Sequence, residues 1–171
     1  CYCPLHQGHL DEIMRAKKEN DLCIVIVCGY DGDRGEPELP LQKRYRIIKN
    51  FLEDSTTKVI YLSDTELGID QSYSDSNWKI WLDAACKKVL AECDYDVGFV
   101  HWYVGEPSYK DHILHQSPAT FRCITVSLVD RNENPVSGTA CREHPLQYWD
   151  KITAPFRAYY SHSILISGTA S

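Results

Sequence analysis

Two histidines lie three positions apart near the start of the chain, in Pro4-Leu5-His6-Gln7-Gly8-His9. Apolar residues at positions 10, 13 and 14 follow at helical spacing, which predicts a helix that begins near His9. Gly8 has no Cβ and lets backbone and ligand approach closely. Because a helix N-terminus offers unpaired N–H groups and about half a positive charge, the segment predicts a cradle for a nucleotide phosphate, with the His6 and His9 imidazoles as added donors. The alternative is that either histidine caps the helix or lies on the surface without a ligand.

A second group of side chains suited to phosphate lies near the other end of the chain. Ser137, Thr139 and Arg142 follow a turn that Pro135 and Gly138 help to shape, at the start of another expected helix. A guanidinium is permanently charged and grips phosphate at two points, and hydroxyls at a helix start add short-range donors. We therefore predict a second phosphate-binding element here. In the alternative interpretation, Ser137 or Thr139 only caps the helix.

The composition describes one ordinary globular domain. The 171 residues are 43% apolar and 25% charged, with a formal net charge of -6. An acidic chain is a poor partner for nucleic acid, which is normally bound by a basic face, and no apolar run reaches the ~18 residues that span a bilayer. We therefore expect a soluble, cytoplasmic protein that binds neither nucleic acid nor membrane and whose phosphates belong to small molecules.

Eight cysteines raise the question of a disulfide or metal site. None of them forms a C-x-x-C pair matched by a second pair, which is the usual zinc pattern. Cys23, Cys28 and Cys123 lie in apolar, strand-like runs, where a reduced thiol behaves as a small hydrophobe. The expectation is structural thiols and no protein-bound metal.

Strand-like and helix-like segments alternate along the chain. We expect strands at 22–28, 58–62, 97–104 and 123–129, and helices at 41–52, from Ser76 or Asn77 through Glu92, and at 109–115. This order predicts an α/β fold with a parallel sheet and helices on both faces, in which ligands bind beyond the C-terminal ends of the strands. Three loops leave those ends, at 29–35, 105–109 and 130–142, and each is rich in glycine or polar donors.

Together, His6-Gln7-Gly8-His9 and Ser137-Gly138-Thr139-Ala140-Cys141-Arg142 resemble the two signatures of the H-x-G-H nucleotidyltransferases, a superfamily with a Rossmann-like fold. Four further stretches, at 29–35, 39–44, 103–106 and 142–145, are similar to the bifunctional nicotinamide-nucleotide adenylyltransferase and ribosylnicotinamide kinase family. This resemblance covers nearly the whole chain. It implies adenylyl transfer from ATP to nicotinamide mononucleotide, which forms NAD and pyrophosphate, with Mg²⁺ on the phosphates.

The resemblance also implies roles for individual residues. His6, His9 and Arg142 would act on the ATP phosphates; Gly8, Gly105, Glu106, Ser137 and Thr139 would bind ATP; and Tyr30, Asp31, Asp33, Arg34, Arg44 and Trp78 would bind the mononucleotide. Trp78 would stack on the nicotinamide ring, unless Trp81 does so and Trp78 packs in the core. A solvated helix face remains the alternative for Arg44, and a plain strand-ending turn remains the alternative for 105–106.

Residues 1–160 are expected to form the nucleotidyltransferase domain, and 161–171 resemble the first strand and the opening of a kinase P-loop, without its lysine. The family also places a strand before the first signature, so we expect a central strand to be missing from the sheet and its apolar edges to be exposed. Two other functions stay open: a related nucleotidyltransferase acting on nicotinate mononucleotide, and a regulatory module that senses NAD or ATP with little turnover. A homo-oligomer is also left open.

Overall fold

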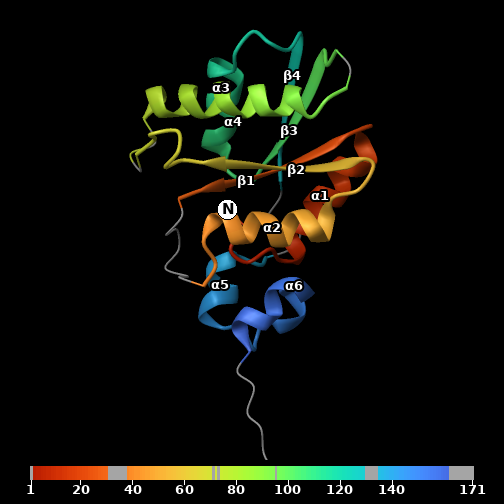
Figure 1. The fold of residues 1–171 in the computed structure, drawn as a ribbon, viewed down its shortest axis with the longest axis vertical. Helices are drawn as coiled ribbons and strands as arrows, with labels where there is room; N and C mark the ends of the chain where they lie inside the picture. The colour runs from red at the N-terminus through yellow and green to blue at the C-terminus, as the bar shows by residue number, and fades with distance from the viewer. Residues whose placement is uncertain are drawn as a thin grey trace, which may run out of the picture.

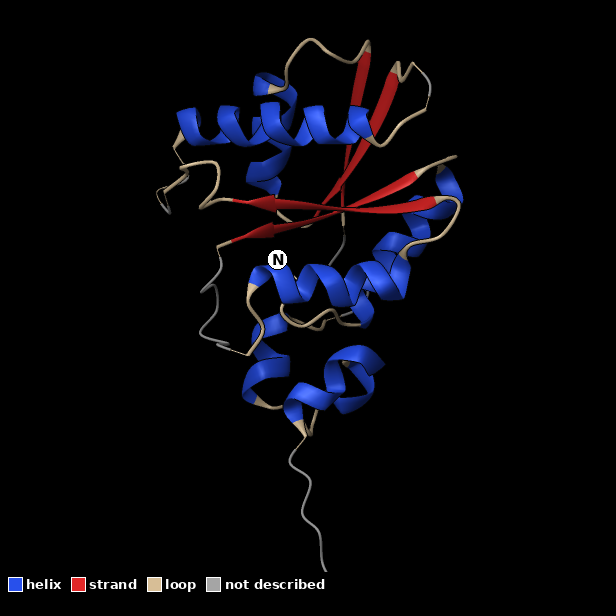
Figure 2. Ribbon diagram, in the orientation of Figure 1, coloured by secondary structure: helices blue, strands red, loops and turns tan. Residues whose placement is uncertain are grey.

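Strands and helices alternate along the chain in the computed structural model, which describes residues 2–30, 38–70, 72, 74–94, 96–129 and 135–161 (Figure 2). The strands are β1 (Cys23–Gly29), β2 (Thr57–Ser63), β3 (Phe99–Val104) and β4 (Cys123–Leu128). The helices are α1 (Gln7–Glu19), α2 (Leu41–Leu52), α3 (Asp75–Ala91), α4 (Pro107–Gln116), α5 (Gly138–Glu143) and α6 (Ala154–Arg157). The expected α/β class, with its alternating order, is confirmed.

The strands form two parallel ladders. β1 pairs with β2 from Cys23↔Thr57 to Gly29↔Ser63, and β3 pairs with β4 from Phe99↔Cys123 to Val104↔Leu128. Within the described residues the two ladders are not joined by strand pairing. The described strands therefore form two separate parallel pairs, and the expectation of a missing central strand stays a prediction.

Helices cover both faces of the β1–β2 ladder (Figure 1). α1, α2, α5 and α6 lie on one side, and α3 and α4 lie on the other. Because side chains alternate along a strand, the two faces have separate cores. The first core contains Leu5, Ile13, Val25, Val27, Leu41, Ile48, Cys141, Ile152 and Phe156. The second core contains Ile60, Leu62, Leu82, Ala85, Trp102, Val104 and Ile113.

Three helix starts differ from the sequence prediction, and one of them is that of α4, which begins at Pro107 and not at Tyr109. α3 is capped by Ser74, whose Oγ accepts from the Asn77 backbone N–H, so the prediction of a cap at Ser76 or Asn77 is wrong. The Asn77 side chain instead donates to Asp70 Oδ1 at 2.7 Å. α1 begins at Gln7, with His6 as the residue that precedes it.

The expectation that Cys123 packs as a small hydrophobe in an apolar strand is wrong. This residue is exposed, whereas Cys23 is buried and Cys28 is partly buried. Cys123 and Thr125 lie on the face of the β3–β4 ladder opposite α4, beside Phe99, which is 78% exposed. In the described part of the chain, no group of three metal-ligating side chains forms and no helix is long and apolar enough to cross a membrane.

Candidate nucleotide site

The first motif forms the start of α1. His6 is buried and extended (φ -128°, ψ 172°), and its carbonyl accepts from the His9 backbone N–H at 3.0 Å. The backbone N–H of His6 in turn donates to His9 Nδ1 at 3.3 Å. The two rings stack with centroids 3.6 Å apart and planes 20° apart. Because His9 Nδ1 accepts a hydrogen bond, the neutral ring carries its proton on Nε2, where it can serve as a donor.

A tyrosine supports the histidine pair from the side. Tyr2 meets the His9 ring edge-on, with centroids 4.8 Å apart and planes 80° apart. Burial, followed by the charge of Glu12, raises the pKa of Tyr2 well above its usual range. Its hydroxyl therefore stays neutral beside the histidines.

Close backbone packing brings the second motif against the first. A Cβ on Gly8 would lie 3.2 Å from Val136 Cγ1, and a Cβ on Gly138 would lie 2.9 Å from the Cys3 carbonyl oxygen. Side chains larger than hydrogen do not fit at the second position without a backbone shift. The glycines of both motifs thus allow the starts of α1 and α5 to meet, although more than a hundred residues separate them.

The polar side chains of the second motif hold this junction together. Arg142 Nη1 donates to the Cys3 carbonyl at 2.5 Å, and Nη2 donates to Thr139 Oγ1 at 3.1 Å. Ser137 Oγ accepts from the Ala140 backbone N–H at 3.1 Å, so the capping role weighed for this residue is present. Ser137 and Thr139 are both exposed, which leaves them accessible to a ligand.

Residues 152 and 153, which follow α5 in the sequence, also contact the first motif. Ile152 forms an antiparallel bridge with His6, and Thr153 donates to the Leu5 carbonyl from its backbone N–H at 3.2 Å and from Oγ1 at 2.9 Å. Sequence reasoning missed Thr153 and Cys3. Neither residue carries a motif, and each acts through a contact with a distant part of the chain.

Arg44 contacts Tyr30, the residue directly after β1. Its side chain is fully buried, and Nη2 donates to the Tyr30 carbonyl at 3.3 Å. The solvated-face alternative for Arg44 is therefore wrong. The Tyr30 hydroxyl donates to the Ile69 carbonyl, and burial, followed by the Asp64 charge, raises the pKa of Tyr30. The predictions for positions 31, 33 and 34 lie outside the described residues.

Trp78 belongs to an aromatic cluster shared by α3 and α4. The His112 ring stacks on it at 4.7 Å with planes 10° apart, and Tyr109 meets it edge-on at 4.9 Å. Trp81 lies 5.9 Å from Trp78, and both pack partly against the second core. Sequence reasoning missed His112 and Tyr109, although their spacing of three on an expected helix could have identified a shared face.

The turn between β3 and α4 contains the predicted residues Gly105 and Glu106. Glu106 precedes α4, and its carbonyl accepts from the Tyr109 backbone N–H at 3.1 Å. This geometry matches a strand-ending turn. Contact of the turn with adenosine stays a prediction.

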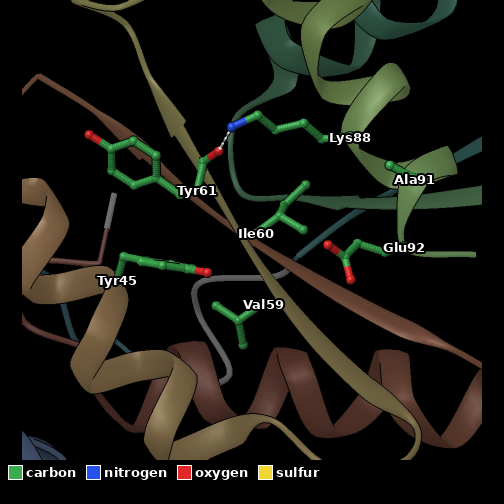
Figure 3. Close-up of a pocket in the computed structure, with 7 residues that line it drawn as sticks. All are labelled: Tyr45, Val59, Ile60, Tyr61, Lys88, Ala91 and Glu92. Carbon is green, nitrogen blue, oxygen red and sulfur yellow. Dashed lines mark hydrogen bonds between the residues drawn. The ribbon is translucent and has the colours of Figure 1, made fainter.

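A hollow lies away from these residues, at the outer edge of β2 (Figure 3). It has a volume of about 240 Å³, and its described lining residues are Tyr45, Val59, Ile60, Tyr61, Lys88, Ala91 and Glu92. Lys88 Nζ donates to the Tyr61 carbonyl, and Glu53 Oε2 accepts from the Val59 backbone N–H at 3.2 Å. These charged side chains protect the outer edge of β2 from pairing with another strand.

The parallel α/β fold, with two candidate phosphate-binding motifs that meet at the starts of α1 and α5, is typical of nucleotidyltransferase domains. The model of the family described as Cytidylyltransferase-like matches residues 1–144, and the chain belongs to this family. The narrower resemblance drawn from the motifs is also confirmed by the relatives.

Two curated relatives are proteins named trifunctional NAD biosynthesis/regulator protein NadR. The chain is 24% identical over 185 residues to that of Escherichia coli, and 25% identical over 187 residues to that of Salmonella typhimurium. Each alignment covers 99% of this chain and 41% of the relative, so this chain spans less than half their length.

Two solved structures share the fold. A NadR protein in complex with NR has a TM-score of 0.81 and 30% identity, and a NadR protein in complex with NAD and AMP-PNP has a TM-score of 0.80 and 31% identity. Both comparisons cover 94% of this chain and 44% of the other. The family expectation therefore agrees with both sequence and structure.

Proposed function

We propose that this chain transfers an adenylyl group from ATP to nicotinamide mononucleotide, forming NAD and pyrophosphate. The observation that carries the proposal is the junction of the two motifs, where Arg142 Nη1 donates to the Cys3 carbonyl at 2.5 Å beside the His6–His9 pair. The similar NadR structures with NAD and AMP-PNP, and with NR, support it.

In this reaction a phosphate oxygen of the mononucleotide attacks the α-phosphorus of ATP, and the bond to the bridging oxygen of pyrophosphate breaks. Repulsion between the two polyanions is the main obstacle, so the protein must align them and offset their charge. The α1 backbone amides and the His9 Nε2 proton would act on one side of the ATP phosphates. Arg142 would act on the other, because a guanidinium has five N–H donors and can hold Thr139, Cys3 and a phosphate together.

Mg²⁺ would enter as part of the substrate, bound to the ATP phosphates, where it offsets charge on the leaving group. The described side chains of the junction are imidazoles, hydroxyls and a guanidinium. These groups are phosphate donors, and the described residues hold no group of three metal-ligating side chains. The donor set therefore suits a metal carried by the nucleotide.

The nicotinamide ring of the mononucleotide would bind to the aromatic cluster around Trp78. A cationic pyridinium ring stacks on indole with about 1–2 kcal/mol when desolvated. The His112 ring already covers one face of Trp78 at 4.7 Å. A ligand ring would have to displace His112 or use the other face, so a variant that removes the imidazole, His112→Ala, should change the KM for the mononucleotide.

The test is product formation by the purified chain. ATP, Mg²⁺ and nicotinamide mononucleotide are mixed with protein, with nicotinate mononucleotide in parallel, and dinucleotide and pyrophosphate are quantified by chromatography. His9→Ala and Arg142→Ala should each lose about 2–4 kcal/mol of transition-state stabilisation, a rate loss of roughly 30- to 1000-fold. His115→Ala and Arg122→Ala, on surfaces away from the motifs, are the matched controls.

The alternative function, a regulatory module that senses NAD or ATP, predicts a different result in this assay. Nucleotide binding measured by calorimetry, with no pyrophosphate released from either mononucleotide, would overturn the enzyme proposal and favour a sensor. Dinucleotide formed only from nicotinate mononucleotide would correct the substrate and retain the reaction.

A further inference from the structure

A row of hydrogen-bonded polar side chains runs across β4, β3 and the end of α1, outside both motifs. Ser127 Oγ lies 2.8 Å from His101 Nε2, and the Tyr103 hydroxyl lies 3.5 Å from His101 Nδ1. Tyr103 then donates to Glu19 Oε2 at 2.6 Å. Asn20 Nδ2 donates to the Tyr103 hydroxyl at 3.0 Å. A serine, an imidazole, a phenol and a carboxylate thus follow one another in space.

The hydrogen bonds of this row determine which atom carries each proton. Tyr103 has one hydroxyl proton and gives it to Glu19, so its oxygen can only accept from His101 Nδ1–H. His101 Nε2 then carries the lone pair, which accepts the proton of Ser127. Hydrogen bonds from Tyr103 and Arg15 lower the pKa of Glu19, and burial, followed by the Glu19 hydrogen bond, raises the pKa of Tyr103. The negative charge therefore stays on Glu19.

Packing fixes the imidazole in this orientation. The rings of His101 and Tyr103 stack at 4.4 Å with planes 23° apart. Tyr103 and Ser127 are opposite each other in the β3–β4 register, so both strands position the pair. Arg15 Nε holds the far end through Glu19 Oε1 at 3.0 Å.

The geometry points to Ser127 as a base-activated nucleophile, an acyl-acceptor site separate from the nucleotide site. A serine hydroxyl hydrogen-bonded to a histidine that a third group orients is the arrangement that activates oxygen nucleophiles. The substrate class is an activated acyl ester. Ser127 Oγ attacks the carbonyl carbon, its proton passes to His101 Nε2 and then to the departing oxygen, and the products are an acyl-serine ester and an alcohol.

A second hydroxyl lies on the same face of β4 as Ser127. Ser127 is partly buried, and Thr125, two residues earlier on the same face of β4, is exposed. Thr125 is opposite His101 in the register, while the recorded hydrogen bond of His101 Nε2 goes to Ser127. The Thr125 hydroxyl can therefore serve as a control for that of Ser127 on the same surface.

The experiment uses the whole chain and p-nitrophenyl acetate, with acetylation located by peptide mass mapping. All samples carry Cys123→Ala, because the exposed thiol of Cys123 would itself react. We expect acetylation at Ser127, abolished by Ser127→Ala and unchanged by Thr125→Ala. His101→Gln should slow it by about tenfold or more. Tyr103→Phe, which keeps the ring stack and removes the hydroxyl, should slow it by a smaller factor.

Melting temperatures establish that each variant is folded before its rate is compared. Equal acetylation of Ser127 and Thr125 would overturn the proposal. So would an undiminished Ser127 rate in both His101→Gln and Tyr103→Phe, or no acetylation at Ser127. These outcomes do not depend on NAD formation, so the nucleotide proposal and the acyl-acceptor proposal are tested separately.

Discussion

Replacing Gly138 by alanine tests whether close backbone packing positions Arg142, the proposed phosphate donor. The new Cβ would lie 2.9 Å from the Cys3 carbonyl oxygen and 3.2 Å from Arg142 Nη1. The first atom belongs to the backbone and cannot rotate away. The two segments must therefore separate, and the hydrogen bond between Arg142 and Cys3 must lengthen.

Two opposing terms set the magnitude of this change. Overpacking costs about 1–3 kcal/mol of unfolding free energy, and alanine regains up to about 1 kcal/mol over glycine within a helix. The net loss is about 0–3 kcal/mol, which corresponds to a fall of at most roughly 12 °C in the melting temperature of a domain of this size. Catalysis should suffer more, because a displacement of about 1 Å in a positioning group can reduce the rate roughly 100-fold.

The assay compares thermal unfolding with the rate of NAD formation. Gly98→Ala is the matched control, because a Cβ at that position would meet its nearest atom, Arg122 Nε, at an ordinary 3.6 Å. We expect the control to keep its activity and Gly138→Ala to lose most of it while remaining folded. A Gly138→Ala protein with the melting temperature and rate of the control would refute the argument from packing.

Three further predictions concern the rest of the domain. Asp54→Asn should reduce the loss of stability at acid pH. An ion pair with a lysine of α1 lowers the pKa of Asp54, so the stability that this carboxylate contributes is present above the ordinary aspartate pKa of 3.8 and is lost as the pH falls below that value. Unfolding midpoints at several pH values will measure the difference. Cys123 should react with iodoacetamide at pH 8 in the folded protein, whereas Cys86, whose pKa burial raises to about 11, should react only after unfolding. Lys88→Met combined with Glu53→Gln should promote concentration-dependent association, seen by ultracentrifugation, because the charged groups that cover the β2 edge are then absent.

Local patterns were enough to predict most of the elements. The range 41–52 is matched by α2 at both ends, and the strand at 58–62 falls within β2. These segments have strong apolar periodicity, which burial in the two cores enforces. The start of α3 was less predictable, because Ser74, Ser76 and Asn77 are all good capping residues and only the three-dimensional contact selects Ser74.

The candidate site was predictable where a motif is local and unpredictable where a contact is distant. The histidine pair and the capping role weighed for Ser137 follow from short segments. The carbonyl of Cys3 and the hydroxyl of Thr153 do not, because each depends on which segments the fold brings together. Burial of Arg44 was equally hidden, since arginine is rarely buried and its helix pattern fits either face.

The two halves of the proposed reaction use residues on opposite faces of the β1–β2 ladder (Figure 1). Leu5 and Cys141, the sequence neighbours of His6 and Arg142, pack in the first core, while Trp78 packs partly against the second core. Side chains from β1 and β2, such as Ile26 and Leu62, pack in that second core, so they connect the halves. In-line attack requires the mononucleotide phosphate and the ATP α-phosphorus to meet at about 3–3.5 Å. We therefore expect the packing of Ile26 and Leu62 in the second core to affect the alignment of the two substrates, and with it the rate.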